Sequence, residues 1–114
     1  MVYQEVYKFN RGRTKVIIYV AHKFGNELEN FERAKKITHN LQVADLENTY
    51  ICPLLALSHL QYGEIGYEAE MELCIDILSN CEKLIVASDL SKGVCREIDF
   101  ANLVGMEVEY LEET

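Results

Sequence analysis

Residues 84 to 101 read Leu84-Ile85-Val86-Ala87-Ser88-Asp89-Leu90-Ser91-Lys92-Gly93-Val94-Cys95-Arg96-Glu97-Ile98-Asp99-Phe100-Ala101, and this stretch decides the fold. Its first four residues form a short apolar run, which is typical of a strand buried on both faces. The polar residues that follow predict a turn, and Ser91 is a residue type that often caps the start of a helix. The stretch therefore predicts a strand, a turn and a helix, an arrangement that can build a binding site.

The predicted helix start has the features of an anion-binding site. Gly93 has no side chain, so a ligand can come close to the backbone. The first amide groups of a helix lack partners within the helix, and the helix dipole favours a negative charge there. We therefore consider Ser91 and Gly93 as substrate-binding residues for an acidic group.

Glu97 stands out in this predicted helix by its position. At about 100° per residue, Val94, Ile98 and Ala101 share an apolar face. Glu97 lies on the border of that face, where its carboxylate would look into a cleft at the C-terminal end of the strand. The alternative is an ordinary surface glutamate near a helix end whose dipole favours negative charge.

Composition limits the classes of function. The 114 residues are enough for one domain, and 49% of them are hydrophobic. The formal net charge of −8 argues against a nucleic-acid polymer as partner, although a small anionic ligand is compatible with it. Without a membrane-length apolar run or a signal-peptide pattern, we expect a soluble, cytoplasmic protein with no membrane partner.

The four cysteines do not have the spacing of a metal site. Cys52, Cys74, Cys81 and Cys95 lack the short paired intervals of zinc ligands, and three of them lie in or beside apolar runs. We interpret them as reduced thiols in or near the core. We expect neither a metal nor a cofactor.

The first half of the chain predicts the opening of a βαβ unit. Residues 1–13 are interpreted as an N-terminal extension, with an edge strand as one interpretation of their apolar pattern. The β-branched run 15–21 predicts the first core strand. A glycine-containing loop and a helix follow, and the apolar positions of that helix are Phe31, Ala34, Ile37 and Leu41.

The remaining elements continue the alternation. Residues 50–52 predict a second strand that Pro53, the only proline, ends. A short helix over 54–57, a helix over 68–78 and a last strand over 106–111 complete the pattern. Residues 59–67 contain two glycines and two tyrosines, which is compatible with a lid or with a plain surface connection.

Alternating strands and helices predict an open α/β domain over residues 14–114. We expect a mainly parallel sheet of four to five strands with helices on both faces. In such sheets, ligands bind beyond the C-terminal ends of the strands, where the strand order reverses. The loops after Ala21 and Cys52 and the turn 88–93 should therefore meet there.

Several segments together resemble the nucleoside 2-deoxyribosyltransferase-like family, in its short bacterial and phage branch. The resemblance covers roughly residues 15 to 111. It rests on Ile-Tyr-Val-Ala-His-Lys-Phe-Gly (18–25), Asn30, Ala34, Cys52-Pro53, Asn-Cys-Glu-Lys-Leu-Ile-Val (80–86) and Ser-Lys-Gly-Val-Cys-Arg-Glu-Ile-Asp-Phe-Ala (91–101). It implies a Rossmann-like (flavodoxin-like) domain that cleaves or transfers the N-glycosidic bond of nucleosides or nucleotides.

The resemblance also implies roles for single residues. Glu97 falls on the nucleophile of the Ser-x-Gly-x-x-x-Glu segment, and Tyr19 on the strand-end tyrosine beside the reacting sugar. Ser91 and Gly93 match the turn that binds phosphate or sugar. Substrate binding is also expected of His22, Phe24 and Gly25; His22 would contact a phosphate or protonate the leaving base, or else simply cap backbone groups at the strand end.

Two positions depart from the family pattern. The aspartate that holds the sugar hydroxyls falls near Cys74, and its flanking residues Glu72 and Asp76 are rotated by about 200° on a helix. Cys95 stands where a second glycine is common. We expect Tyr19, Asp76 or a neighbouring subunit to position the sugar instead.

The chemistry implied for Glu97 is displacement at the anomeric carbon of the sugar, as in retaining glycosidases. The base would stack on Phe24, Tyr62 or Tyr67. A nucleotide-binding module without turnover, which senses or sequesters its ligand, is the alternative of a different class, and a protein-interaction domain is the third. The resemblance further implies a homodimer or higher homo-oligomer, and we expect the helix over 68–78 to lie in its interface.

Overall fold

The structure is a computed structural model that describes residues 15–111. The expected edge strand within residues 1–13 therefore lies outside the described part of the chain. In chain order the elements are β1 (Ile17–Ala21), α2 (Leu28–Ala44), β2 (Thr49–Ile51), α3 (Pro53–Ala56), α4 (Tyr67–Ser79), β3 (Lys83–Val86), α5 (Lys92–Val104) and β4 (Glu107–Tyr110).

The four described strands form one parallel sheet in the order β2-β1-β3-β4. Tyr19 pairs with Ile51 of β2 on one side and with Leu84 of β3 on the other, so β1 lies at the centre. The chain runs outward from β1 to β2 and then crosses back to β3. The strand order thus reverses between β1 and β3, which is where α/β sheets of this kind bind ligands.

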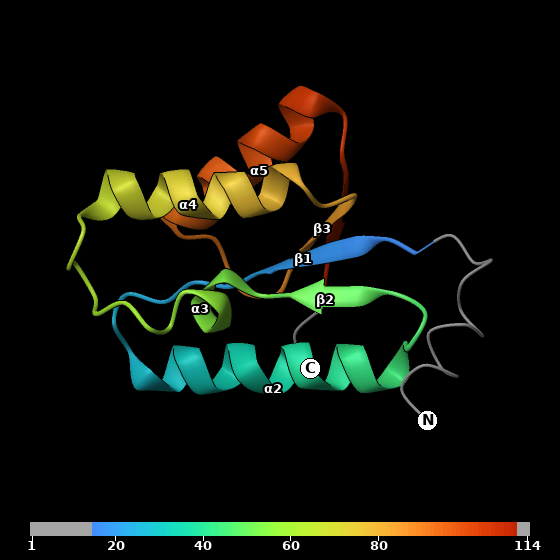
Figure 1. Ribbon diagram of the computed structural model, residues 1–114, viewed down its shortest axis with the longest axis horizontal. Coiled ribbons are helices and arrows are strands. Elements are labelled where there is room, and N and C mark those ends of the chain that lie inside the picture. Colours follow the sequence, from blue (N-terminus) through green and yellow to red (C-terminus); the bar gives the residue numbers. More distant parts are fainter. Residues whose placement is uncertain (1–14, 112–114) are drawn as a thin grey trace, which may run out of the picture.

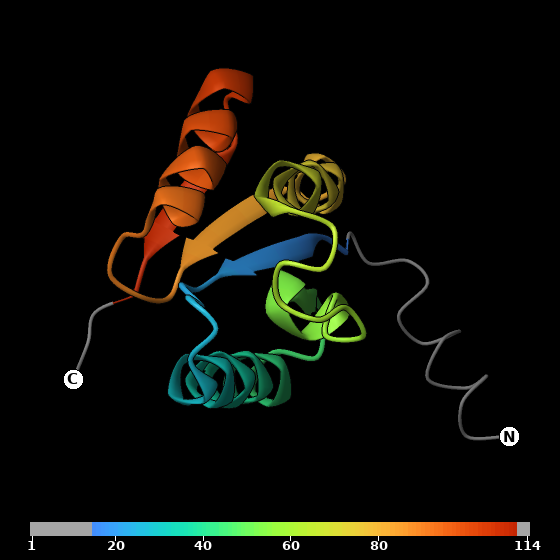
Figure 2. The same cartoon turned by 90° about the vertical axis from the view of Figure 1, so that its left-hand side faces the viewer.

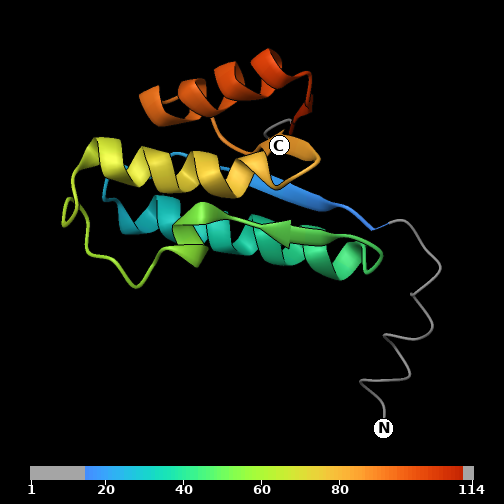
Figure 3. The same ribbon diagram turned by 45° about the horizontal axis from the view of Figure 1, so that its top comes forward.

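Helices cover both faces of the sheet, as the alternating pattern predicts (Figures 1 and 2). Helices α4 and α5 lie on one face, and Figure 3 shows them side by side. Helices α2 and α3 lie on the other face. The domain is therefore a Rossmann-like α/β layer structure, in agreement with the fold expected from the sequence.

Side chains of the central strands alternate between two cores. Tyr19 and Leu84 pack with α4 and α5, in a core that includes Leu78 and Val94. Val20, the next residue along β1, points to the opposite face and packs in the core that includes Ala34 of α2. Because successive strand residues point to opposite faces, Tyr19 is directed towards α5.

The sequence signals for element ends are confirmed. Pro53 is the first residue of α3, and only Cys52 separates it from the end of β2. The Ser91 hydroxyl accepts a hydrogen bond from the Val94 amide and caps α5. Gly105 ends the same helix with a φ of 77°, a left-handed conformation that glycine adopts readily. Among residues 15–111, no helix combines the length and the apolar character needed to cross a membrane.

Candidate functional site

A buried carboxyl and a buried phenol meet between β1 and α5. The Tyr19 hydroxyl donates a hydrogen bond to the Glu97 carboxylate across 78 positions of sequence. Glu97 is only 5% exposed and Tyr19 is fully buried. The interpretation of Glu97 as an ordinary surface glutamate is therefore wrong, because the α5 side chain turns inwards against β1 rather than into solvent.

Burial changes the ionisation of both groups. Desolvation raises the pKa of Glu97 from 4.5 to about 7, against the hydrogen bond from Tyr19, which lowers it. Burial, followed by the negative charge of Glu97, raises the pKa of Tyr19 well above its usual value. Tyr19 therefore stays protonated, while Glu97 exchanges its proton close to neutral pH.

Cys74 of α4 is the third member of this cluster. Its thiol lies beside the Tyr19 hydroxyl, and its pKa is raised to about 11, first by burial and then by the charge of Glu97. All four cysteines are free thiols, and Cys52 and Cys81 are buried. The expectation of reduced thiols in or near the core agrees with this arrangement.

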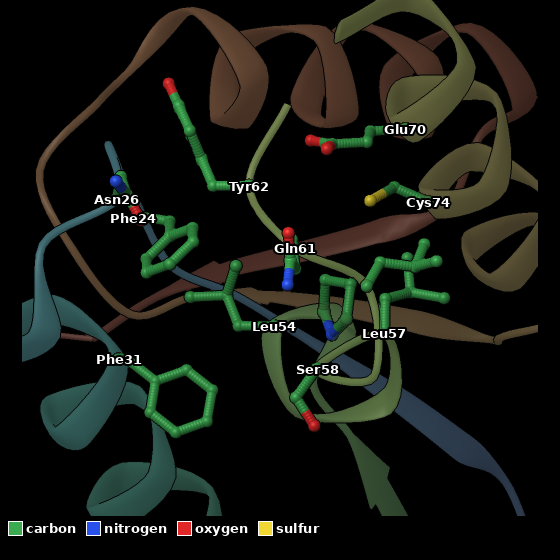
Figure 4. A pocket seen from close by; sticks show the side chains of 12 residues that line it. Phe24, Asn26, Phe31, Leu54, Leu57, Ser58, Gln61, Tyr62, Glu70 and Cys74 are labelled. Carbon is green, nitrogen blue, oxygen red and sulfur yellow. The ribbon is translucent and has the colours of Figure 1, made fainter. Parts of the chain in front are cut away.

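A cavity of about 310 Å³ opens at the C-terminal edge of the sheet (Figure 4). Its volume is at the small end of the range of small-molecule sites, roughly 300–1,000 Å³. Its apolar lining consists of Phe24, Phe31, Pro53, Leu54, Leu57, Leu60 and Tyr62. Its polar lining consists of Asn26, Ser58, Gln61, Glu70 and Cys74.

Aromatic rings form one side of this cavity. The Phe24 ring packs edge-on against Tyr62, with centroids 5.8 Å apart and planes at 75°. On its other side Phe24 packs against Phe31 at 6.3 Å. Tyr62 is 60% exposed, so its ring has a free surface on which a flat ligand can stack.

Two polar side chains of α4 form the opposite side. Glu70 and Cys74 are one helical turn apart, and Figure 4 shows both directed towards the side of the cavity where Phe24 lies. The Glu70 carboxylate also accepts a hydrogen bond from the Gly63 amide, at 3.3 Å. Through this bond, a residue of the cavity lining also holds the loop between α3 and α4 against α4.

Cys74 borders the cavity on one side and the Tyr19–Glu97 pair on the other. Glu97 itself does not line the cavity as described. The carboxylate therefore lies next to the cavity lining, with Cys74 as the residue common to both.

Comparison with known proteins adds no information about function. The chain has no significant match among protein-family models, curated proteins or solved structures. We therefore infer the function of this protein from the geometry of the site.

The structure places Ser91 and Gly93 away from the cavity. A Cβ atom on Gly93 would lie 3.4 Å from the Met71 sulfur and 3.9 Å from the Tyr67 hydroxyl, so this side of the helix start faces α4. Lys92 lies over the Tyr67 ring, 5.1 Å from its centroid. Gly93 thus lies against α4, and Tyr67 packs there and does not line the cavity.

His22 is a buried histidine at the end of β1. It is 4% exposed, and burial is the main reason that its pKa is lowered, so it is neutral near pH 7. Its Nδ1 atom lies 2.7 Å from the Lys23 carbonyl oxygen and donates to it in the tautomer that this contact favours. Its Nε2 atom has no partner among the described residues. His22 does not line the cavity.

The loop after β1 is held by hydrogen bonds between its backbone and side chains of other segments. The Lys23 amide donates to the Ser88 hydroxyl at 2.9 Å, which joins this loop to the turn after β3. The Asn30 side chain donates to the Phe24 carbonyl at 3.0 Å. Gly25 and Asn26 both have left-handed backbones, with φ of 60° and 59°. This turn places Phe24 and Asn26 in the lining, while Gly25 has no side chain to contribute.

Asp76 belongs to a different part of the surface. It is exposed and lines a groove along α4, together with Met71 and Arg96. The structure does not bring Asp76 to Glu97 or to the cavity. Within residues 15–111, no group of three or more His, Cys, Asp or Glu side chains is arranged to hold a metal ion.

The sequence reasoning missed Glu70 and most of the apolar lining. Glu70 precedes Cys74 by four positions, so it shares a helix face with the residue that the family pattern singles out. This spacing in the sequence could have indicated that Glu70 faces the same site as Cys74. By contrast, no pattern in the sequence indicates that Leu54, Leu57 and Leu60 surround a cavity, because apolar residues at these intervals are equally typical of plain packing.

Proposed function

We propose that this protein cleaves or transfers the N-glycosidic bond of a nucleoside or nucleotide, with Glu97 as the nucleophile. The observation that carries the proposal is the buried pair of Tyr19 and Glu97, adjacent through Cys74 to an aromatic cavity at the C-terminal edge of the sheet. The residues of the pair are the two that the family resemblance assigns to the reacting sugar.

The proposed reaction has two steps. The ionised Glu97 attacks the anomeric carbon, a C–O bond forms, and the bond from that carbon to the base nitrogen breaks. The base leaves with the electron pair and takes a proton from water. Water, or a second base in a transfer reaction, then displaces the Glu97 carboxylate from the sugar.

The neighbours of Glu97 support this use of the carboxylate. Tyr19 donates to the ionised form and limits the rise in pKa that burial causes, so a substantial fraction of Glu97 is ionised near neutral pH. Phe24 and Tyr62 offer aromatic faces for the base. His22 is neutral and outside the cavity, which does not favour it as the proton donor.

A nucleotide- or nucleoside-binding module without turnover is the second candidate. The absence of Glu97 from the residues that line the cavity favours it, since the carboxylate does not face the bound ligand there. Such a module would use the cavity to sense or sequester its ligand. The buried pair would then serve only the packing of α5 against β1.

The proposal is tested by incubation with the common ribo- and deoxyribonucleosides and their 5′-monophosphates, scored by chromatography for free base. We expect base release by the wild type and by Glu72→Gln, which removes an exposed carboxylate from α4. Glu97→Gln should release none. Ligand binding by the wild type without base release would establish the binding module, and equal release by Glu97→Gln would reject the nucleophile.

A further inference from the structure

The only charge in the cavity lining of the described residues is negative. Of the twelve described residues that line it, Glu70 alone carries a charge, and none is a lysine, arginine or histidine. The chain as a whole carries a formal net charge of −8. A ligand with several negative charges would therefore meet a carboxylate and no cation in the cavity that the structure describes.

The helix start that could bind a phosphate does not border the cavity. The Ser91 hydroxyl accepts from the Val94 amide and caps α5, and Met71 and Tyr67 lie beside Gly93. Lys92 and Arg96 lie over the Tyr67 ring, with centroid distances of 5.1 and 5.5 Å. Lys92 and Arg96 thus contact Tyr67 of α4, and neither residue lines the cavity.

Glu70 is placed to accept hydrogen bonds from a ligand. One carboxylate oxygen accepts from the Gly63 amide, and within residues 15–111 the structure records no partner for the other. Figure 4 shows the carboxylate directed towards the cavity, on the same side as Cys74. A carboxylate in this position suits the hydroxyl groups of a sugar, which are uncharged donors.

We infer that Glu70 makes the cavity selective for an uncharged nucleoside over its 5′-monophosphate. The inference rests on the proposed function and narrows its substrate class. The Phe24 and Tyr62 rings receive the base, and the free oxygen of Glu70 accepts a hydrogen bond from a sugar hydroxyl. The volume of about 310 Å³ suits a ligand of this size. The bond from Gly63 holds the loop between α3 and α4 beside the bound sugar.

The test is a calorimetric comparison of each nucleoside with its own 5′-monophosphate. It is performed with full-length Glu97→Gln protein, so that turnover does not disturb the binding measurement. Repulsion in water between one carboxylate and a phosphate dianion several ångström away corresponds to roughly tenfold in affinity. We therefore expect at least one nucleoside to bind about tenfold more tightly than its monophosphate.

Two further variants distinguish the effect of the Glu70 charge from the effect of the net negative charge of the protein. Glu70→Gln, in the same background, keeps an acceptor for Gly63 and should reduce the discrimination by about tenfold, because the repulsion is removed. Glu72→Gln removes the same charge two positions away, at an exposed site that does not line the cavity, and should leave the discrimination unchanged.

The inference is overturned if a monophosphate binds as tightly as its nucleoside, if no nucleoside binds, or if Glu72→Gln acts like Glu70→Gln. These results are distinct from a failure of the proposed function. Selective nucleoside binding without base release by the wild type would reject the reaction and keep the inference. Base release from monophosphates alone would keep the reaction and reject the inference.

Discussion

Replacement of Glu97 by glutamine should make the protein more stable at alkaline pH and leave its stability nearly unchanged at acid pH. Below pH 4.5 the carboxyl is protonated in the folded and the unfolded chain, so its ionisation costs nothing. Between pH 4.5 and about 7 the folded chain keeps a proton that the unfolded chain loses, and the free energy of unfolding falls. Above about pH 7 the carboxyl is ionised in both the folded and the unfolded chain, and the free energy of unfolding falls no further. The total loss that corresponds to the pKa difference is about 3 kcal/mol.

The assay is urea unfolding of the wild type and Glu97→Gln at pH 4.5 and pH 8.5, followed by circular dichroism. The advantage of the variant should grow by about 3 kcal/mol between the two pH values. Glu72→Gln, at an exposed position of α4, should show no comparable growth. The same difference between wild type and Glu97→Gln at both pH values would refute a buried carboxyl with a raised pKa.

Three further changes have defined outcomes. Tyr19→Phe removes the hydrogen-bond donor that lowers the pKa of Glu97. The rising limb of kcat/KM against pH, which we expect near pH 7 in the wild type, should therefore move to higher pH. A limb that does not move would contradict the role of the hydroxyl. Ser91→Ala removes the α5 cap and should lower the free energy of unfolding by about 1 kcal/mol in urea titrations, whereas no loss would mean that the cap contributes nothing. Tyr62→Ala removes an exposed ring and should weaken nucleoside binding about threefold to tenfold by calorimetry, and unaltered affinity would place the base elsewhere.

Much of the fold could be predicted because local signals and the overall pattern agree. The β-branched run 15–21 contains β1, Pro53 begins α3 shortly after β2, and Ser91 caps α5. Helices alternate with strands, so a parallel sheet covered on both faces follows from elementary packing. Short apolar strands flanked by glycine, proline and capping residues leave few other arrangements.

The site was harder to predict because it depends on how far helices rotate against the sheet. Glu97 lies at the border of an apolar face in sequence, and a small rotation of α5 decides between solvent and core. The structure buries it beside Tyr19. Similarly, α4 turns Glu70 and Cys74 towards the cavity and leaves Asp76 outside. Spacing along one helix does not determine its rotation about its own axis.

The central claim is that Glu97 forms a covalent bond with the sugar, and mass spectrometry of the protein tests it most directly. Wild-type protein at high concentration is mixed with each deoxynucleoside and ribonucleoside, quenched with acid after seconds, and analysed intact and as peptides. We expect a sugar adduct on the peptide that contains Glu97, and no such adduct in Glu97→Gln. Base release with an adduct on another residue, or with Glu97 unmodified at every quench time, would contradict it.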